Sequence, residues 1–270
     1  MLRFSKEISL IAICNFLIIN PCKIWNLHDI RRFFQLDHCD SILRFFQEMT
    51  KKQFAEIICK KFSLKGITPS SFVYVLNCML IGIVMVKVPG KNVYKLYFSI
   101  YPLWMSNLKE CLDMPLFQQP ILNNKNMDIY LPENMTEDDV DFVLHQCQKQ
   151  VPFIPARNIP FNDIVAFLHR ILKDSTFAGN FVLKMKVYRL IYSIALICND
   201  FKTAESVYKT ISQSIDQWDD AIFQYWYGDK KSYLNQQKEY DSNRIMLQTN
   251  LQINLQNLKI CKMPKYTFES

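Results

Sequence analysis

Residues 83–101 read IVMVKVPGKNVYKLYFSIY, and they carry the clearest structural signal in the chain. Residues 83–88 and 93–101 are interpreted as two alternating runs, in which residues two apart share a face, with Pro89-Gly90-Lys91-Asn92 between them. A period of two is typical of strands, and a short loop containing Pro and Gly joins neighbouring antiparallel strands. These residues therefore predict a β-hairpin, which carries Lys87, Lys91 and Lys95.

The residues before the hairpin predict helices. Apolar residues recur at helical spacing over 8–19, 28–36 and 41–62. Thr68-Pro69 is typical of a helix start, because Pro is favoured at the first helical position, and it predicts a fourth helix that ends near Leu80.

Helices followed by a basic two-stranded wing resemble a winged-helix domain. The resemblance covers at most residues 8–101 and rests on the order of elements and on the charged hairpin tip. It implies that the helix before the wing approaches a nucleic acid. That helix, residues 70–80, contains no Lys, Arg or Gln, which argues against base-specific reading and leaves protein contacts open.

The second half of the chain predicts a helical bundle. Residues 110–135 contain three prolines and little periodicity, and we expect a linker there. Thr136 and Asp139 form a capping box that starts a helix reaching Gln150. Further helices are expected at residues 161–173, 182–199, 201–214, 218–227 and within 230–258, followed by a loose tail at 259–270.

Residues 182–199 and 201–214 resemble one helical hairpin of the tetratricopeptide kind, although no second copy follows. The predicted fold is thus mostly α. A winged-helix-like module at 1–109 is joined by a linker at 110–135 to a helical bundle at 136–258.

The positive charge lies in the front part of the chain. Residues 1–111 contain 15 Lys and Arg against 7 Asp and Glu, whereas residues 112–270 contain 17 against 18. The excess is densest over 51–109, which contains nine basic residues and one acid, Glu56. A local excess of this kind attracts polyanions.

These basic residues are the candidate nucleic-acid contacts, with a tyrosine of the hairpin placed to stack on bases. Lysine outnumbers arginine here, which suits loose phosphate contact better than bidentate base reading. A solvated lysine face and an acidic protein partner are the alternatives. The candidates are Lys51, Lys52, Lys60, Lys61, Lys65, Lys87, Lys91, Lys95 and Tyr97.

The motifs of common catalytic and metal sites are missing from the sequence. It contains no Gly-rich phosphate loop and no C-x-x-C pair. Cys22, His28, His38 and Cys39 lie close together, but their spacing fits no zinc pattern. The remaining histidines, His145 and His169, can be paired with many cysteines without any nucleophile signature. We expect no enzyme activity, no cofactor and no metal.

Several aromatic residues fill the core or form a partner-binding patch. They are Trp104, Phe117, Trp218, Tyr225, Trp226 and Tyr227.

Nine scattered cysteines indicate reduced thiols in an intracellular protein. The apolar run at 8–19 is too short to span a bilayer, and it is read as a buried helix, an organelle-targeting segment or a secretory signal. The sequence predicts a non-catalytic adaptor subunit of a larger hetero-complex, with the nucleus favoured. The alternative is a mitochondrial RNA-processing or RNA-binding factor.

Overall fold

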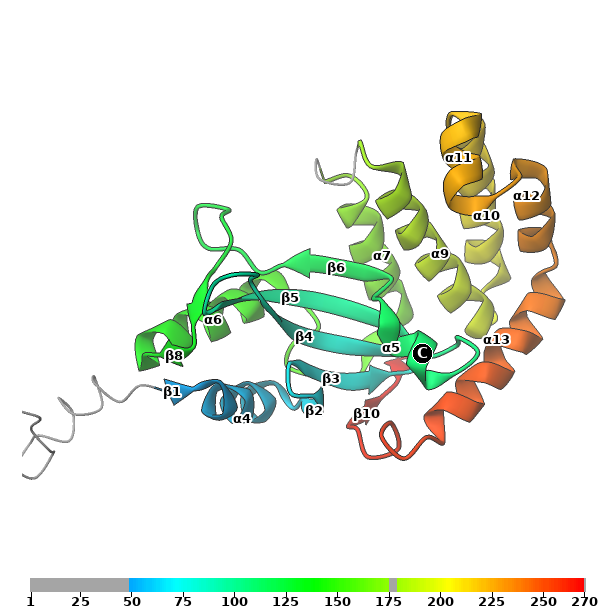
Figure 1. Ribbon diagram of the computed structural model, residues 1–270. Coiled ribbons are helices and arrows are strands. Elements are labelled where there is room, and N and C mark those ends of the chain that lie inside the picture. Colours follow the sequence, from blue (N-terminus) through cyan, green and yellow to red (C-terminus); the bar gives the residue numbers. More distant parts are fainter. Residues whose placement is uncertain (1–48, 175–178, 270) are drawn as a thin grey trace, which may run out of the picture. The chain divides into compact units, whose positions relative to one another are not determined.

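The computed structural model describes residues 49–174 and 179–269, which belong to one compact unit, Glu48–Ser270. Its centre is a seven-stranded sheet, and helices pack against it (Figure 1). The fold is therefore a mixture of helices and sheet, and the predicted mostly α fold with a winged-helix module is wrong. The helices expected at 8–19 and 28–36, and the first residues of the one expected at 41–62, lie outside the described residues.

The hairpin is confirmed. Strands β4 (Met79–Lys87) and β5 (Val93–Pro102) pair antiparallel from Lys87 opposite Tyr94 to Met79 opposite Pro102. Gly90 lies in the connecting turn with a φ of 72°, a backbone conformation that residues with a Cβ rarely adopt.

The prediction of a helix at 70–80 is wrong, because these residues form a strand and a turn. Strand β3 (Ser71–Leu76) pairs antiparallel with β4, and Asn77 turns the chain with a φ of 51°. Residues 72–76 are all buried, so the strand has no polar face and shows no alternation in sequence. Its β-branched and aromatic residues were the true signal, and Thr68-Pro69 starts no helix.

The sheet is widened by short strands from distant parts of the chain. β2 (Lys65–Thr68) and β10 (Lys265–Tyr266) pair with β3, the latter in parallel. β6 (Phe117–Pro120) and β7 (Leu131–Pro132) pair with β5. Residues expected to form a linker and a loose tail thus belong to the sheet, where they satisfy backbone groups of its longer strands.

Four more short segments complete the strand pairing. β1 (Met49–Thr50) pairs with β8 (Asn134–Met135), and β9 (Ile159–Pro160) pairs with β11 (Phe268–Glu269). Segments of two residues are too short to show any periodicity, so sequence patterns do not reveal them.

Helix starts follow the capping signals. α4 (Lys51–Phe62) begins with a capping box between Thr50 and Gln53, and it buries every fourth residue, including Phe54 and Phe62. α6 (Glu137–Gln150) begins with the predicted capping box, in which Thr136 accepts a bond from the amide of Asp139.

The helices expected beyond residue 160 are present, with shifted ends. They are α7 (Phe161–Ile171), α9 (Phe181–Ile197), α10 (Phe201–Asp216), α11 (Asp220–Tyr227), α12 (Lys230–Lys238) and α13 (Tyr240–Leu255). They gather at the end of the sheet where α5 (Leu108–Asp113) lies (Figure 1). Among the described residues, no helix is long and apolar enough to cross a membrane.

Sheet and helices share one core. Four phenylalanine rings form one cluster in this core: Phe98 of β5, Phe117 of β6, Phe153 and Phe167 of α7. The ring centroids of the contacting pairs are 5.1–6.4 Å apart. The buried hydroxyl of Tyr74 donates to the carbonyl of Phe153 at 3.1 Å. These contacts fix the segment between α6 and α7 against the sheet, and this segment carries part of the candidate site.

Candidate nucleic-acid interface

The structure divides the predicted basic residues into two groups. Lys51 lies at the start of α4, where its Nζ donates to the Ser70 hydroxyl at 2.8 Å and sits 4.8 Å from the ring centre of Tyr94. Lys52 is exposed on the same helix. Tyr94 lies opposite Lys87 beside the hairpin turn, so Lys51 packs at the turn end of the hairpin, whereas Lys60 and Lys61 lie at the other end of α4.

The hairpin group is partly neutralised. Lys95 pairs with Asp128 and lies 5.0 Å from the ring centre of Tyr130, and the bond to Asp128 raises the pKa of the ammonium. The amide of Glu133 donates to the carbonyl of Asn92 at 3.2 Å, which places a second acid beside the hairpin turn.

The other hairpin candidates keep more freedom. Lys87 and Lys91 are exposed, and Tyr97 is half-buried on β5. Because Asp128 is paired with Lys95, the exposed Lys87 and Lys91 are left with Glu133 as the nearby acid, so the hairpin tip keeps a small net positive charge.

The second group lies at the β3 edge of the sheet, and the fold enlarges it. Lys65 on β2 donates to the carbonyl of Lys262 at 2.9 Å, and Val75 on β3 donates to the carbonyl of Pro264 at 2.9 Å. The carbonyl of Phe62 accepts from the amide of Ala156 at 3.0 Å, which brings Arg157 beside the end of α4.

We call the resulting set the cationic edge. It gathers exposed side chains from three separate parts of the chain: Lys60, Lys61, Lys65, Arg157, Lys262 and Lys265. None of the six forms an ion pair within the part of the chain that the structure describes. Lys60, Lys61 and Lys65 were predicted from the sequence. Lys262 and Lys265 were missed because residues 259–270 were expected to be loose, and Arg157 was missed because only the bond from Ala156 to Phe62 brings it to this edge.

A signal for the missed residues does exist in the sequence. No Asp or Glu occurs in residues 57–109 or in residues 242–268. The two acid-free stretches lie side by side along β3, so the cationic edge has no acid from either of them.

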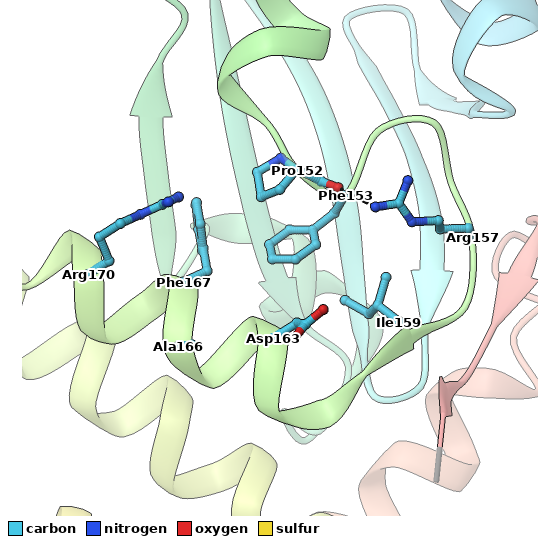
Figure 2. Close-up of a pocket in the computed structure, with 8 residues that line it drawn as sticks. All are labelled: Pro152, Phe153, Arg157, Ile159, Asp163, Ala166, Phe167 and Arg170. Atoms are coloured by element: carbon cyan, nitrogen blue, oxygen red, sulfur yellow. Dashed lines mark hydrogen bonds between the residues drawn. The ribbon is translucent and has the colours of Figure 1, made fainter.

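A cavity of about 330 Å³ adjoins the cationic edge through Arg157 (Figure 2). Phe153 and Phe167 form its apolar floor, and Arg157 and Arg170 stand on opposite sides of these two rings. Its volume is at the lower end of the range for small-molecule sites, about 300–1,000 Å³. The remaining lining residues are Pro152, Ile159, Asp163 and Ala166.

The cavity walls are held in place from several sides. Arg157 donates to the carbonyl of Pro152 at 3.0 Å, and the Arg170 guanidinium lies 5.4 Å from the ring centre of Phe167. Asn158, next to Arg157, accepts from the amide of Thr267 at 2.9 Å. Two guanidinium groups above an apolar floor suit a planar group that carries or adjoins negative charge.

Within residues 49–174 and 179–269, no group of three or more His, Cys, Asp or Glu residues could hold a metal ion. The earlier metal candidates Cys22, His28, His38 and Cys39 lie outside those residues. Burial raises the pKa of the Cys147 thiol to about 12, which disfavours the reactive thiolate. Burial also lowers the pKa of the His169 imidazole, and the positive charge of Lys173 lowers it further.

Comparisons with known proteins identify no relative. No protein-family model, no curated protein and no solved structure matches the chain.

Proposed function

We propose that this protein is a non-catalytic adaptor that binds single-stranded nucleic acid along the cationic edge. The convergence of Lys60, Lys61, Lys65, Arg157, Lys262 and Lys265 on one edge carries the proposal. When exposed cations without ion-pair partners contact phosphates, they displace the counterions that the nucleic acid has condensed, and this release supplies sequence-independent affinity. Lysines on flexible stems follow a variable backbone without reading bases.

The adjoining cavity favours a single strand over a duplex. A base in a duplex is stacked and paired, and taking it out costs a few kcal/mol. In a single strand, one base can enter beside Phe153 and Phe167 while its neighbouring phosphates stay on the lysines. The guanidinium groups of Arg157 and Arg170 add stacking surface for such a base.

An acidic protein partner would also use the cationic edge. It would not need an Arg-flanked cavity with an aromatic floor, so the cavity makes the nucleic acid the better fit. Binding of a single strand that requires the cavity residues separates the two cases.

The test is binding of a labelled single strand across a salt series, with wild-type protein and the triple variant Lys61→Glu, Lys65→Glu, Lys265→Glu. The wild type should bind with strong salt dependence. The variant should bind more weakly, and its slope of log K against log salt should fall by about 2, which is about 0.7 for each of three phosphate contacts.

A matched control makes the same three-residue change of charge on another part of the protein. Lys202, Lys231 and Lys238 are exposed on α10 and α12, and their replacement by Glu should lower affinity only through net charge, with little change in slope. Equal losses in both triple variants would show that net charge alone governs binding. A loss confined to a Lys87→Glu, Lys91→Glu variant would move the interface to the hairpin.

A further inference from the structure

Helix α11 presents large apolar side chains to solvent. Ile222, Tyr225 and Trp226 are 51%, 82% and 55% exposed, and their spacing of three and four residues puts them on one face. We call these three residues the α11 surface. Of the aromatic residues singled out in sequence, Trp104, Phe117 and Trp218 are buried, so the core reading holds for these three but not for Tyr225 or Trp226.

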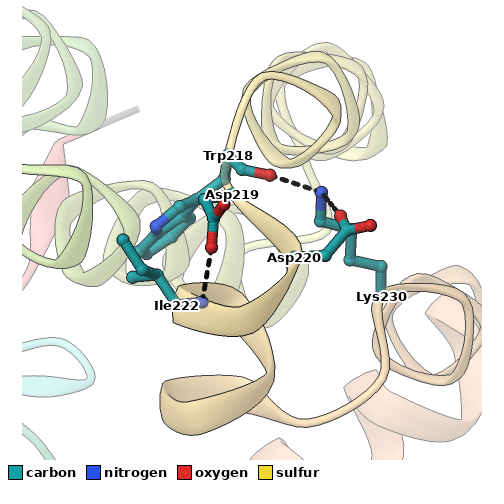
Figure 3. Close-up of polar contacts among 5 residues, drawn as sticks. All are labelled: Trp218, Asp219, Asp220, Ile222 and Lys230. Atoms are coloured by element: carbon teal, nitrogen blue, oxygen red, sulfur yellow. Dashed lines mark hydrogen bonds and ion pairs between the residues drawn. The ribbon is translucent and has the colours of Figure 1, made fainter.

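The α11 surface sits on a firmly held helix. Asp219 accepts from the amide of Ile222 at 3.0 Å, which caps the start of α11. Lys230 donates to the carbonyl of Trp218 and pairs with Asp220, which ties α11 to α12 (Figure 3).

Aromatic packing holds the inner face of the same helix. The buried ring of Phe223 lies 5.4 Å from Trp218, 5.4 Å from Tyr227 and 5.6 Å from Tyr233, measured between centroids. A rigid helix loses little entropy when a partner binds its outer face, so contacts there convert efficiently into affinity.

The exposed residues are of the kind that dominate interfaces. Tyr and Trp are enriched among the side chains that cost most when truncated in protein complexes. Tyr225 and Trp226 also touch each other, with ring centroids 5.4 Å apart and planes at 87°. Together they form one continuous aromatic feature.

The charge around the α11 surface is opposite to that of the cationic edge. Residues 210–231 contain Asp216, Asp219, Asp220 and Asp229 against Lys230 and Lys231, and Lys230 pairs with Asp220, so a smaller net negative charge remains. Asp220 remains 91% exposed at its side chain although it pairs with Lys230. This field repels nucleic acid and favours a cationic partner.

We propose that the α11 surface docks a basic amphipathic helix of a partner protein. Apolar residues of that helix cover Ile222, Tyr225 and Trp226, and its Lys or Arg residues face the exposed Asp216. This interface goes beyond nucleic-acid binding and does not depend on it. It would give the adaptor a protein-binding site separate from the cationic edge.

The test uses a displayed library of amphipathic helical peptides of about 16 residues, roughly four turns, with Lys, Arg, Asp and Glu randomised on the polar face. Selection is made on the wild type and counter-selected on Tyr225→Ala, Trp226→Ala. Recovered peptides should be enriched in Lys and Arg. The double variant should weaken their binding about tenfold or more.

Two further variants make the outcome decisive. Asp216→Lys, which leaves the Lys230–Asp220 pair intact, should weaken the same peptides. Ile245→Ala with Met246→Ala should not, because those residues are also exposed but lie on α13. Peptides without basic enrichment would overturn the proposal. So would concentration-dependent self-association that the Tyr225→Ala, Trp226→Ala variant abolishes, because a second copy would then cover the surface.

Discussion

Gly82 shows how closely two strands approach at the centre of the sheet. A Cβ built on it would lie 2.0 Å from the carbonyl oxygen of Phe72 and 2.7 Å from the Cα of Val73. Neither atom belongs to a side chain that could rotate away, so any larger residue must move the backbone of β3.

Replacing this glycine should therefore be costly. We expect Gly82→Ala to lower the free energy of unfolding by about 3 kcal/mol, the upper part of the range for overpacked sites. Gly179→Ala is the control, because nothing lies within 4 Å of a Cβ there. Urea unfolding measures both, and an unchanged midpoint for Gly82→Ala would contradict the close approach of β3 and β4.

A buried thiol makes stability depend on alkaline pH. Burial holds the pKa of Cys147 at about 12 in the folded protein, whereas an unfolded cysteine has a pKa of about 8.5. Above about pH 8.5 the unfolded chain loses this proton first, so the free energy of unfolding falls as pH rises towards 12, by up to about 1.4 kcal/mol per pH unit.

The contribution of that thiol can be isolated by substitution. Cys147→Val should give a flatter decline of unfolding free energy between about pH 8.5 and 10.5 than the wild type. Urea unfolding of both proteins at several pH values gives the difference. Parallel curves would mean that Cys147 ionises equally in both states.

At the scale of elements, local signals located the parts of the fold that follow from neighbouring residues. The hairpin, the capping box of α6 and the helix pair α9 and α10 were predictable, because alternation, capping and helical periodicity are local. β3 was missed because both of its faces are buried. β10 was missed because a strand of two residues is defined only by its partner.

β10 matters beyond its length. The carbonyl of Pro264, just before β10, accepts from the amide of Val75 at 2.9 Å, and the carbonyl of Tyr266 accepts from the amide of Asn77 at 2.8 Å. The ring centroid of Tyr266 lies 5.5 Å from that of Tyr74.

Removing this strand should therefore weaken the whole sheet. We expect deletion of residues 264–270 to lower the free energy of unfolding by at least about 2 kcal/mol, as expected for losing acceptors of buried amides. Thermal unfolding compares the deletion with Lys265→Gln, which keeps the strand. A deletion as stable as the wild type would show that β10 does not belong to the folded sheet.

At the scale of the molecule, positive charge gathers at the cationic edge and several aspartates gather near α11. The cationic edge draws on residues near positions 60, 157 and 262, and the α11 surface, with aspartates before and after it in sequence, draws on one segment near 220. The sequence indicated half of the cationic edge, because Lys60, Lys61 and Lys65 lie in a visibly basic stretch. Lys262 and Lys265 reach the edge through the pairing of β10 with β3, and Arg157 reaches it through the bond from Ala156 to Phe62; no local pattern encodes either contact.

The most direct test of the cationic edge is lysine footprinting. Wild-type protein is acetylated with and without a single strand of about 16 nucleotides, the upper end of typical site sizes, and each lysine is followed by mass spectrometry. The strand should protect Lys61, Lys65, Lys262 and Lys265 together and leave Lys87 and Lys91 reactive. Protection confined to Lys87 and Lys91, or no protection at saturating strand, would contradict the account.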